Sequence, residues 1–257
     1  MKISINVPTY NESKQIGTLV NNVKEVADEI ILIDNSKDDT VRIAKKSSNK
    51  VKIVHYEIKD FSKIRNEGIK NVKKEWYILY LDSDELLSKE LIKSLNVLKQ
   101  RNENLADAYL IKRSHYFNYG TYSAHLTTRL IKGEPKLFKK GIIRFVNVSH
   151  EKPVFIKESN KIETIKGDTL HYPITGKYNT GSTYLKMHIN GTIKENKFNK
   201  ELKNQLKQLI KYILIFDYNP KYWRGNIKFW IESVRYTSRF IKEYMKTLKT
   251  SQELQKH

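Results

Sequence analysis

The first half of the chain alternates between continuous apolar runs and segments in which apolar residues recur at helical spacing. The apolar runs predict buried strands, at residues 2–10, 29–34, 50–57 and 76–82. The spaced segments predict helices, at residues 11–26, 40–47, 62–74 and 89–101. The first helix has Asn11 or Ser13 as its expected N-cap, and the last has Ser88. Strands that alternate with helices across short loops predict an α/β domain with a mostly parallel sheet covered by helices on both faces.

The second half of the chain has a different pattern. Residues 107–120 predict a strand with an aromatic and partly basic face. The stretch 126–175 predicts shorter strands, with turns at residues 133–135, 140–141 and 167–168. From about residue 178 the spacing is helical, with a break at 217–226. We therefore predict an α/β domain over residues 1–176 and a helical region over residues 177–257.

Composition excludes several classes of protein. The chain has 257 residues, of which 39% are hydrophobic and 30% charged, as in a folded globular protein. The absence of cysteine excludes disulfides, thiolate zinc sites and cysteine nucleophiles. The first residues lack a signal-peptide pattern, and no apolar run approaches the roughly 18–20 residues that a membrane span requires. These features predict a cytoplasmic protein.

The charge is strongly positive, with 48 lysines and arginines against 28 acidic residues, giving a formal net charge of +20. Such an excess favours anionic partners, which include nucleic acid, anionic lipid headgroups and phosphorylated substrates. The basic residues are spread over the whole chain, and no recognisable nucleic-acid module is present. We therefore predict no nucleic-acid partner, and keep a basic nucleic-acid-binding protein as the alternative from a different class.

Acidic residues follow two of the predicted strands: Asp34 and Asp38 after one, Asp82 and Asp84 after another. In open parallel sheets, ligands bind beyond the carboxyl ends of the strands. An Asp-x-Asp element there suits Mn²⁺ or Mg²⁺, which prefer oxygen ligands and neutralise a diphosphate leaving group. Lysine partners, or solvated acids that cap helix 89–101, would explain the same residues. Glycine-rich phosphate loops of the P-loop or dinucleotide type are absent, which excludes those nucleotide-binding classes.

Four stretches together resemble a known family: "VPTYNE" (7–12), "ILIDNSKDDTVRIAKK" (31–46), "FSKIRNEGI" (61–69) and "WYILYLDSDELLSKEL" (76–91). They are similar to family 2 glycosyltransferases of the GT-A fold, in particular the branch of lipopolysaccharide-core β-glycosyltransferases. The resemblance continues through "TRLIKGEPKLFKKG", "VSHEKPV" and "LHYP". It implies a Rossmann-like α/β domain that binds a nucleotide sugar, followed by a helical extension on the acceptor side.

The resemblance also implies roles for individual residues. Eight would bind the nucleotide part of the donor: Pro8, Thr9, Tyr10, Glu12, Asp34, Arg65, Asn66 and Asp82. Two would bind a divalent metal or the diphosphate: Asp84 and His171. Two would lie where the acceptor enters, with the carboxylate as general base: His150 and Glu151.

Each assignment has a structural alternative. Asp34 could be a turn residue, His150 and Glu151 a salt-bridged strand end, and His171 a hydrogen-bonded histidine. The segment "DNSKDDT" is one residue shorter than the family's usual pattern, which leaves the role of Asp38 open.

The implied reaction is an inverting, metal-dependent transfer from a nucleotide-diphosphate sugar, with a UDP-sugar favoured, to a hydroxyl of a glycan or lipid-linked acceptor. A polyprenyl-phosphate sugar synthase of the same fold stays open, as does an inactive nucleotide-sugar binder. The C-terminal segment contains an apolar stripe at helical spacing, with basic residues around it. The stripe consists of Ile227, Trp230, Ile231, Val234, Ile241 and Met245. Such a helix suits the anionic inner face of the cell membrane, but it could equally pack on the α/β domain or in a homodimer.

Overall fold

The computed structural model describes residues 1–57, 60–101, 103–118, 123–126, 133–147, 151–156, 161–172, 199, 201–204, 206–207, 210 and 220–254. Contacts divide the chain into two compact units, the first formed by Met1–Ser114 with Ile131–Tyr172 and the second by His115–Leu130 with Pro173–His257. The predicted domain boundary at residues 176 and 177 lies outside the described residues, so it stays a prediction. The same holds for the helical pattern expected over residues 178–198.

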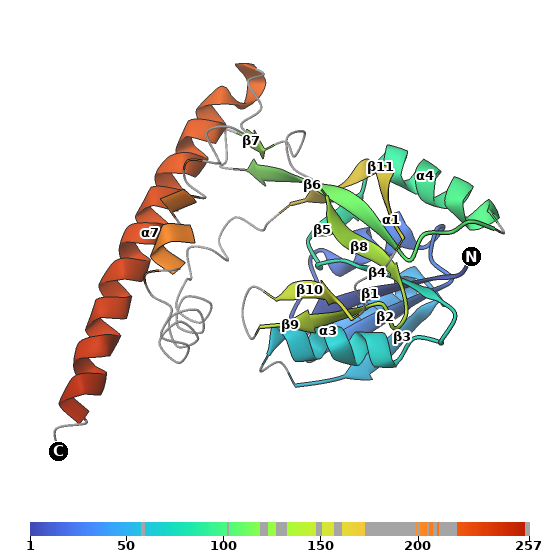
Figure 1. Cartoon of the computed structure of the whole chain (residues 1–257), viewed down its shortest axis with the longest axis horizontal. Coiled ribbons are helices and arrows are strands. Elements are labelled where there is room, and N and C mark those ends of the chain that lie inside the picture. The colour runs from blue at the N-terminus through green and yellow to red at the C-terminus, as the bar shows by residue number, and fades with distance from the viewer. Residues whose placement is uncertain are drawn as a thin grey trace. The chain divides into compact units, whose positions relative to one another are not determined.

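Four parallel strands form one part of the main sheet (Figure 1), in the order β3 (Val51–His55), β2 (Glu29–Asp34), β1 (Ile3–Thr9) and β4 (Tyr77–Tyr80). Their apolar residues serve two cores, one on each face. In β2, for example, Ile30 and Leu32 join one core, whereas Ile31 and Ile33 join the other. Burial on both faces explains why these strands appear in the sequence as uninterrupted apolar runs.

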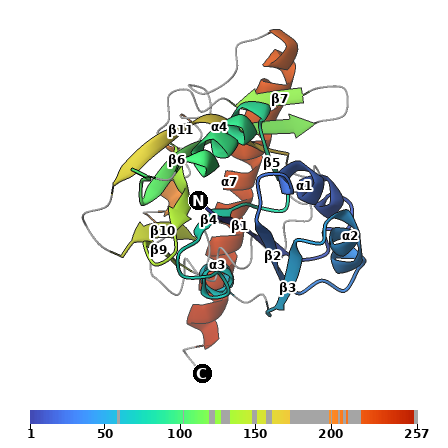
Figure 2. The same cartoon turned by 90° about the vertical axis from the view of Figure 1, so that its right-hand side faces the viewer.

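Helices cover both faces of these strands. On one face α1 (Ile16–Val23) lies beside α2 (Thr40–Ser47), and on the other lies α3 (Phe61–Lys70), as Figure 2 shows. The expected N-caps Asn11 and Ser13 are wrong, because α1 begins only at Ile16. Asn11 instead has a φ of 56°, and its side chain accepts a hydrogen bond of 2.8 Å from the Lys37 backbone, which shapes the loop after β1.

Antiparallel strands complete the sheet (Figure 1). Next to β4 come β8 (Glu134–Lys139), β6 (Ala108–Asn118), β11 (Ile162–His171) and the short β5 (Glu85–Leu87). The end of β6 also pairs with β7 (Ser123–Leu126), while β9 (Ile143–Val146) and β10 (Lys152–Phe155) form a separate pair. The parallel part thus corresponds to the strands predicted from sequence, and the α/β architecture is confirmed.

Two of the three predicted turns are wrong, because Glu134 and Pro135 belong to β8, and Gly167 and Asp168 to β11. The predicted turn at Gly141 is confirmed by a φ of 90°. Gly167 has a φ of 93°, and a Cβ atom there would lie only 2.3 Å from the Leu91 backbone nitrogen. The glycine therefore permits a close approach to α4 (Lys89–Gln100) rather than a change of chain direction.

The predicted N-cap of α4 is confirmed, since the Ser88 hydroxyl accepts a hydrogen bond of 3.1 Å from the Leu91 backbone nitrogen. Ser88 also accepts one from the backbone of Asp168, and its own N–H donates to the Asp168 carbonyl. The N-terminus of α4 is therefore fixed directly to β11.

The second unit contains α7 (Pro220–Leu254). This helix begins at Pro220, a residue suited to a first helical turn, so the break predicted over 217–226 is wrong from that residue onward. Its buried positions include Phe229, Phe240 and Tyr244. Among the described residues, no helix is both long and apolar enough to span a membrane.

Candidate active site

Asp34 ends β2 beside the last residue of β1. Its carboxylate accepts hydrogen bonds of 2.7 Å from the Thr9 hydroxyl and 2.6 Å from the Ser36 hydroxyl, and another from the Ser36 backbone. Asp34 and Thr9 are each only 1% exposed. In this structure the carboxylate therefore organises the ends of two neighbouring strands, and its predicted contact with base or ribose stays a prediction.

The segment after β4, residues 82–85, contains three acids and is called here the acidic loop. Its first residue, Asp82, lies between two arginines. Arg65 of α3 donates a hydrogen bond to one carboxylate oxygen, and Nη2 of Arg113, on β6, lies 3.1 Å from the other. Burial alone would raise the pKa of Asp82, but the positive charges of Arg65, Arg113 and the nearby Lys136 outweigh it and hold the pKa well below its usual range. Asp82 is therefore a carboxylate at neutral pH.

Arg65 is the centre of this arrangement. Its Nη1 donates to the Leu81 carbonyl at 3.1 Å, and its Nε lies 3.1 Å from Oε1 of Glu151. The guanidinium also lies over the Tyr80 ring, 5.0 Å from its centroid, which is a cation–π distance. Burial alone would lower the pKa of Arg65, but Asp82 and Glu151 raise it, so the charge is permanent. One buried guanidinium thus joins the acidic loop to the start of β10.

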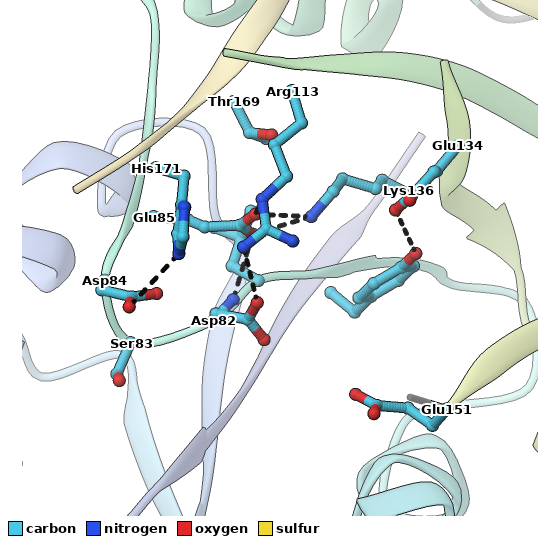
Figure 3. A network of polar contacts seen from close by, with 12 residues as sticks. Asp82, Ser83, Asp84, Glu85, Arg113, Glu134, Lys136, Glu151, Thr169 and His171 are labelled. Carbon is cyan, nitrogen blue, oxygen red and sulfur yellow. Dashed lines mark hydrogen bonds and ion pairs between the residues drawn. The ribbon is translucent and has the colours of Figure 1, made fainter. Parts of the chain in front are cut away.

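Glu85, at the other end of the acidic loop, is completely buried and has two cationic partners. Nζ of Lys136, on β8, lies 2.7 and 2.9 Å from the two carboxylate oxygens, and Nε of Arg113 lies 2.8 Å from Oε1. The same carboxylate accepts a hydrogen bond of 3.1 Å from the Asp82 backbone nitrogen. Figure 3 shows Arg113 and Lys136 converging on Glu85 from two strands.

Asp84 lies opposite His171, the last residue of β11, with 3.4 Å between the carboxylate and Nε2. The backbone fixes this pair, because Glu85 is in register with His171 and the Tyr172 nitrogen donates to the Asp84 carbonyl at 2.8 Å. Within the described part of the chain, no lysine or arginine forms an ion pair with Asp84. The two predicted metal ligands, 87 positions apart in the sequence, are therefore neighbours.

This pair fits a divalent metal. Two adjacent ligands of an octahedral ion, each about 2.1 Å from it, are roughly 3 Å apart, close to the observed 3.4 Å. The described residues contain no cluster of three or more acidic, histidine or cysteine side chains that could hold a metal. Two protein ligands leave coordination positions for phosphate oxygens and water, as at Mg²⁺ sites that combine one or two carboxylates with a nucleotide, although here one of the two ligands is an imidazole nitrogen.

The other residues predicted to bind the donor differ in their exposure and in their contacts. Tyr10 is half-exposed, whereas Glu12 is buried and accepts a hydrogen bond of 2.6 Å from Gln15. Pro8 lines a small internal cavity beside Arg65. The Asn66 amide both donates to and accepts from the Phe145 backbone, at 2.9 Å each, so it fastens β9 to α3. His150 lies outside the described residues, and its role stays a prediction.

Three residues of this network were not predicted from the sequence as site residues: Glu85, Arg113 and Lys136. The signal that could have found two of them is a cation at an inward position of a strand, since a buried cation requires a buried acid. Among the described residues, arginine and lysine form ion pairs with Asp82 and Glu85, whereas Asp84 has no lysine or arginine within ion-pair distance and interacts with Arg113 only at longer range.

The match to a known protein family covers most of these site residues. The profile described as Glycosyl transferase family 2 matches residues 4–159, which include the acidic loop and Glu151. The chain belongs to this family of glycosyltransferases, and its fold is GT-A. The lipopolysaccharide-core branch stays a prediction.

Three relatives illustrate the match. Uncharacterized glycosyltransferase RP128 of Rickettsia prowazekii is 32% identical over 180 residues, 66% of this chain and 60% of the relative. Glycosyltransferase SunS from the SPbeta prophage of Bacillus subtilis is 43% identical over 90 residues, 34% of this chain and 21% of SunS. The poly(ribitol-phosphate) β-N-acetylglucosaminyltransferase TarS of Staphylococcus aureus is 32% identical over 122 residues, 44% of this chain and 21% of TarS.

A solved structure of S. aureus TarS aligns with a TM-score of 0.47 at 20% identity, covering 75% of this chain and 39% of that one. The chain therefore spans about three fifths of the Rickettsia relative, and about a fifth of SunS and TarS.

Proposed function

We propose that this glycosyltransferase transfers a sugar, with inversion, from a nucleoside-diphosphate donor to a hydroxyl of its acceptor. One observation supports the proposal: Asp82 and Glu151 share the guanidinium of Arg65, Asp84 lies 3.4 Å from His171, and Asp84 has no lysine or arginine within ion-pair distance among the described residues. This leaves one carboxylate available for a metal beside a permanent cation, Arg65.

Asp84 and His171 would hold Mn²⁺ or Mg²⁺. The metal, when bound, would neutralise the diphosphate and so make it a better leaving group. Asp82 stays ionised and could accept hydrogen bonds from the donor's ribose or from water. Arg65 could exchange a carboxylate partner for a phosphate oxygen, because guanidinium groups bind both. A UDP-sugar is the favoured donor.

Glu151 would act as the general base. Its carboxylate would take the proton of the acceptor hydroxyl as the oxygen forms a bond to the anomeric carbon and the bond from that carbon to the diphosphate breaks. An α-linked donor would then give a β-linked product, without a covalent enzyme intermediate. The Arg65 contact orients the carboxylate, which leaves the second oxygen to accept the proton.

The acceptor would be a glycan or a lipid-linked molecule that carries phosphate. The net charge of +20 favours an anionic acceptor, and the name of the relative TarS designates a poly(ribitol-phosphate) acceptor. A polyprenyl phosphate, with phosphate rather than hydroxyl as nucleophile, is the alternative within the same fold.

Contact with an anionic membrane surface is a further part of the proposal. Along α7, Trp223, Ile227, Ile231 and Met245 are between 40% and 64% exposed. Arg235, Arg239 and Lys242 are also exposed, on the neighbouring side of the helix. An apolar stripe that contains tryptophan next to a basic stripe suits the interface of an anionic bilayer. A homodimer contact through the same stripe is the alternative.

Thermal unfolding tests the donor site. A panel of nucleotide sugars, each with Mn²⁺ and with a chelator, should include one that raises the unfolding temperature only when metal is present, since a ligand of the native state stabilises it. A phosphate-bearing acceptor should then yield a β-linked product. Stabilisation by every nucleotide sugar regardless of metal would contradict the proposed metal role, and an α-linked product would contradict inversion.

A further inference from the structure

We infer that Lys136 is a positioning residue for the donor site, which it maintains by neutralising Glu85. The inference rests on the proposed donor and metal site. Lys136 is 1% exposed and Glu85 is 0% exposed, so neither is placed to touch a substrate. Their contacts, however, reach the residues that would.

Glu85 controls the acidic loop through both its side chain and its backbone. The side chain accepts the Asp82 backbone N–H, which fixes the start of the loop. The backbone pairs with His171, which places that histidine opposite Asp84. A displaced Glu85 would therefore disturb the two predicted metal ligands together.

The Glu85 carboxylate can remain buried only because cations compensate its charge. Arg113 cannot do so alone, since its guanidinium is shared with Asp82 at 3.1 Å. Among the described residues, ion pairs join three carboxylates of this cluster, Asp82, Glu85 and Glu151, to three cations, Arg65, Arg113 and Lys136. Without Lys136 one acid of the cluster would lose its cation, and Arg113 would be drawn from Asp82 toward Glu85.

The Tyr80 ring holds Lys136 in place. Nζ of Lys136 lies 4.9 Å from the centroid of that ring, and the Arg65 guanidinium lies 5.0 Å from the same centroid. Burial is the main cause of a pKa of Tyr80 well above the ordinary value, so the ring stays neutral and can accept both cations. Lys136 therefore lies between the Glu85 carboxylate and the face of the Tyr80 ring.

Direct binding tests the inference. Binding of UDP in the presence of Mn²⁺ is measured by calorimetry for the wild type and for Lys136→Met, and bound Mn²⁺ is followed independently by electron paramagnetic resonance. We expect both affinities to fall about 10–100-fold in the variant, the usual effect of losing an outer-shell partner of a metal site. Lys139→Met is the matched control, because this lysine is on the same strand but is 42% exposed and pairs with Glu75. The control should bind as the wild type does.

The double variant Glu85→Gln/Lys136→Met distinguishes neutralisation of Glu85 from any other effect of losing Lys136, because it removes the acid together with its cation. It should recover most of the affinity lost in Lys136→Met, since the amide oxygen of the introduced glutamine can still accept the Asp82 N–H. If Lys136→Met and the double variant bind UDP and Mn²⁺ equally weakly, the inference is overturned. It is also overturned if Lys136→Met folds and binds both as tightly as the wild type.

If Lys136→Met does not fold, the affinity for UDP with Mn²⁺ is compared between Glu85→Gln and the double variant. An affinity more than tenfold lower in the double variant overturns the inference. Failure of the wild type to bind UDP with Mn²⁺ would instead refute the UDP-sugar donor of the proposed function, an outcome distinct from failure of the inference.

Discussion

Nε of Arg65 lies 3.1 Å from Oε1 of Glu151, a residue 86 positions further along the chain. The same guanidinium donates to Asp82, so it links the proposed acceptor-side base to the proposed donor-side carboxylate. A lysine could not make these contacts together, because they require the forked geometry of a guanidinium. Glu151 is thereby held beside the proposed donor site even though it belongs to the loop before β10.

Glu151→Gln should lower turnover by about 10²–10⁴-fold, the usual range for loss of a general base. Glutamine is nearly isosteric and can still accept the hydrogen bond from Arg65, so binding of UDP should change little. Steady-state kinetics and calorimetry measure the two effects separately. The control is Glu90→Gln, an exposed acid of α4. Lost donor affinity with an unchanged rate would assign Glu151 to the donor instead.

Asp84→Asn should reduce metal-dependent turnover by more than about 100-fold, because even outer-shell partners of a metal cost 10–100-fold. The fold should be retained, since within the described residues Asp84 forms no ion pair with a lysine or arginine that the substitution would break. Activity as a function of Mn²⁺ concentration and the circular dichroism spectrum give the two readouts. Ser83→Ala, one position earlier in the loop, is the control. Full activity of Asp84→Asn, or of the wild type in excess chelator, would contradict the metal role.

Gly167→Ala should destabilise the protein more than Gly141→Ala. Both glycines have a φ near +90°, so alanine at either costs roughly 1–2 kcal/mol of backbone strain. Only at Gly167 would the new Cβ meet neighbouring backbone, 2.3 Å from the Leu91 nitrogen, whereas nothing lies within 4 Å at Gly141. We expect about 1–3 kcal/mol of additional loss from this overlap, measured by urea unfolding. Equal effects would mean that α4 moves away from β11 without cost.

Asp38 should contribute stability that disappears in acid. Its carboxylate accepts hydrogen bonds from the Thr40 backbone at 3.0 Å and the Ser13 backbone at 3.2 Å. Desolvation raises its pKa, but these hydrogen bonds and that from the Thr40 hydroxyl outweigh it and lower the pKa from 3.8 to about 2. Because the folded pKa is lowered, the contribution is present above about pH 4 and is lost as the pH falls toward about 2.

Urea unfolding of the wild type and Asp38→Asn across this range measures the Asp38 contribution. The difference in unfolding free energy should be largest at neutral pH and should shrink as the pH falls from about 4 to about 2. Asp39→Asn, which loses only an exposed pair with Arg42, should show a smaller difference. A difference that does not vary with pH would show that Asp38 acts through packing rather than charge.

Ile227→Gln/Ile231→Gln and Lys242→Glu should each reduce flotation of the protein with vesicles that contain anionic lipid. The first removes exposed apolar groups, and the second reverses a charge that near such a surface is worth roughly 1 kcal/mol. Val97→Gln, at a half-exposed residue of α4, is the control. Equal recovery on neutral and anionic vesicles would refute the membrane contact, and a variant that becomes monomeric would assign the stripe to a dimer.

The parallel strands were predictable because burial on both faces leaves a direct trace in the sequence. Among the antiparallel strands, β6 lies within the strand predicted at residues 107–120, but parts of β8 and β11 were predicted as turns, since Pro135 and Gly167 resemble turn residues when only neighbouring positions are considered. For Gly167 the determining contact is with Leu91, 76 positions away. The choice of glycine there depends on a helix that local pattern cannot place.

The candidate site shows the same limit. Asp82 and Asp84 were found because they end an apolar run, and His171 because of the family resemblance. Arg113 and Lys136 were not found, because their partner Glu85 belongs to another strand and the pairing depends on the order of strands in the sheet. Local sequence identifies the acids, whereas the fold decides which of them a cation already compensates.

The buried pair of Glu85 and Lys136 also has a consequence for how the family's sequences diverge. A chain that lost either charge alone would retain an uncompensated ion beneath its acidic loop, so these positions should be replaced together or not at all. Among related sequences, an apolar residue at the position of Lys136 should accompany an uncharged residue at the position of Glu85. Lys139 is partly exposed and pairs with Glu75, so its replacements should be independent of the residue at the position of Glu85.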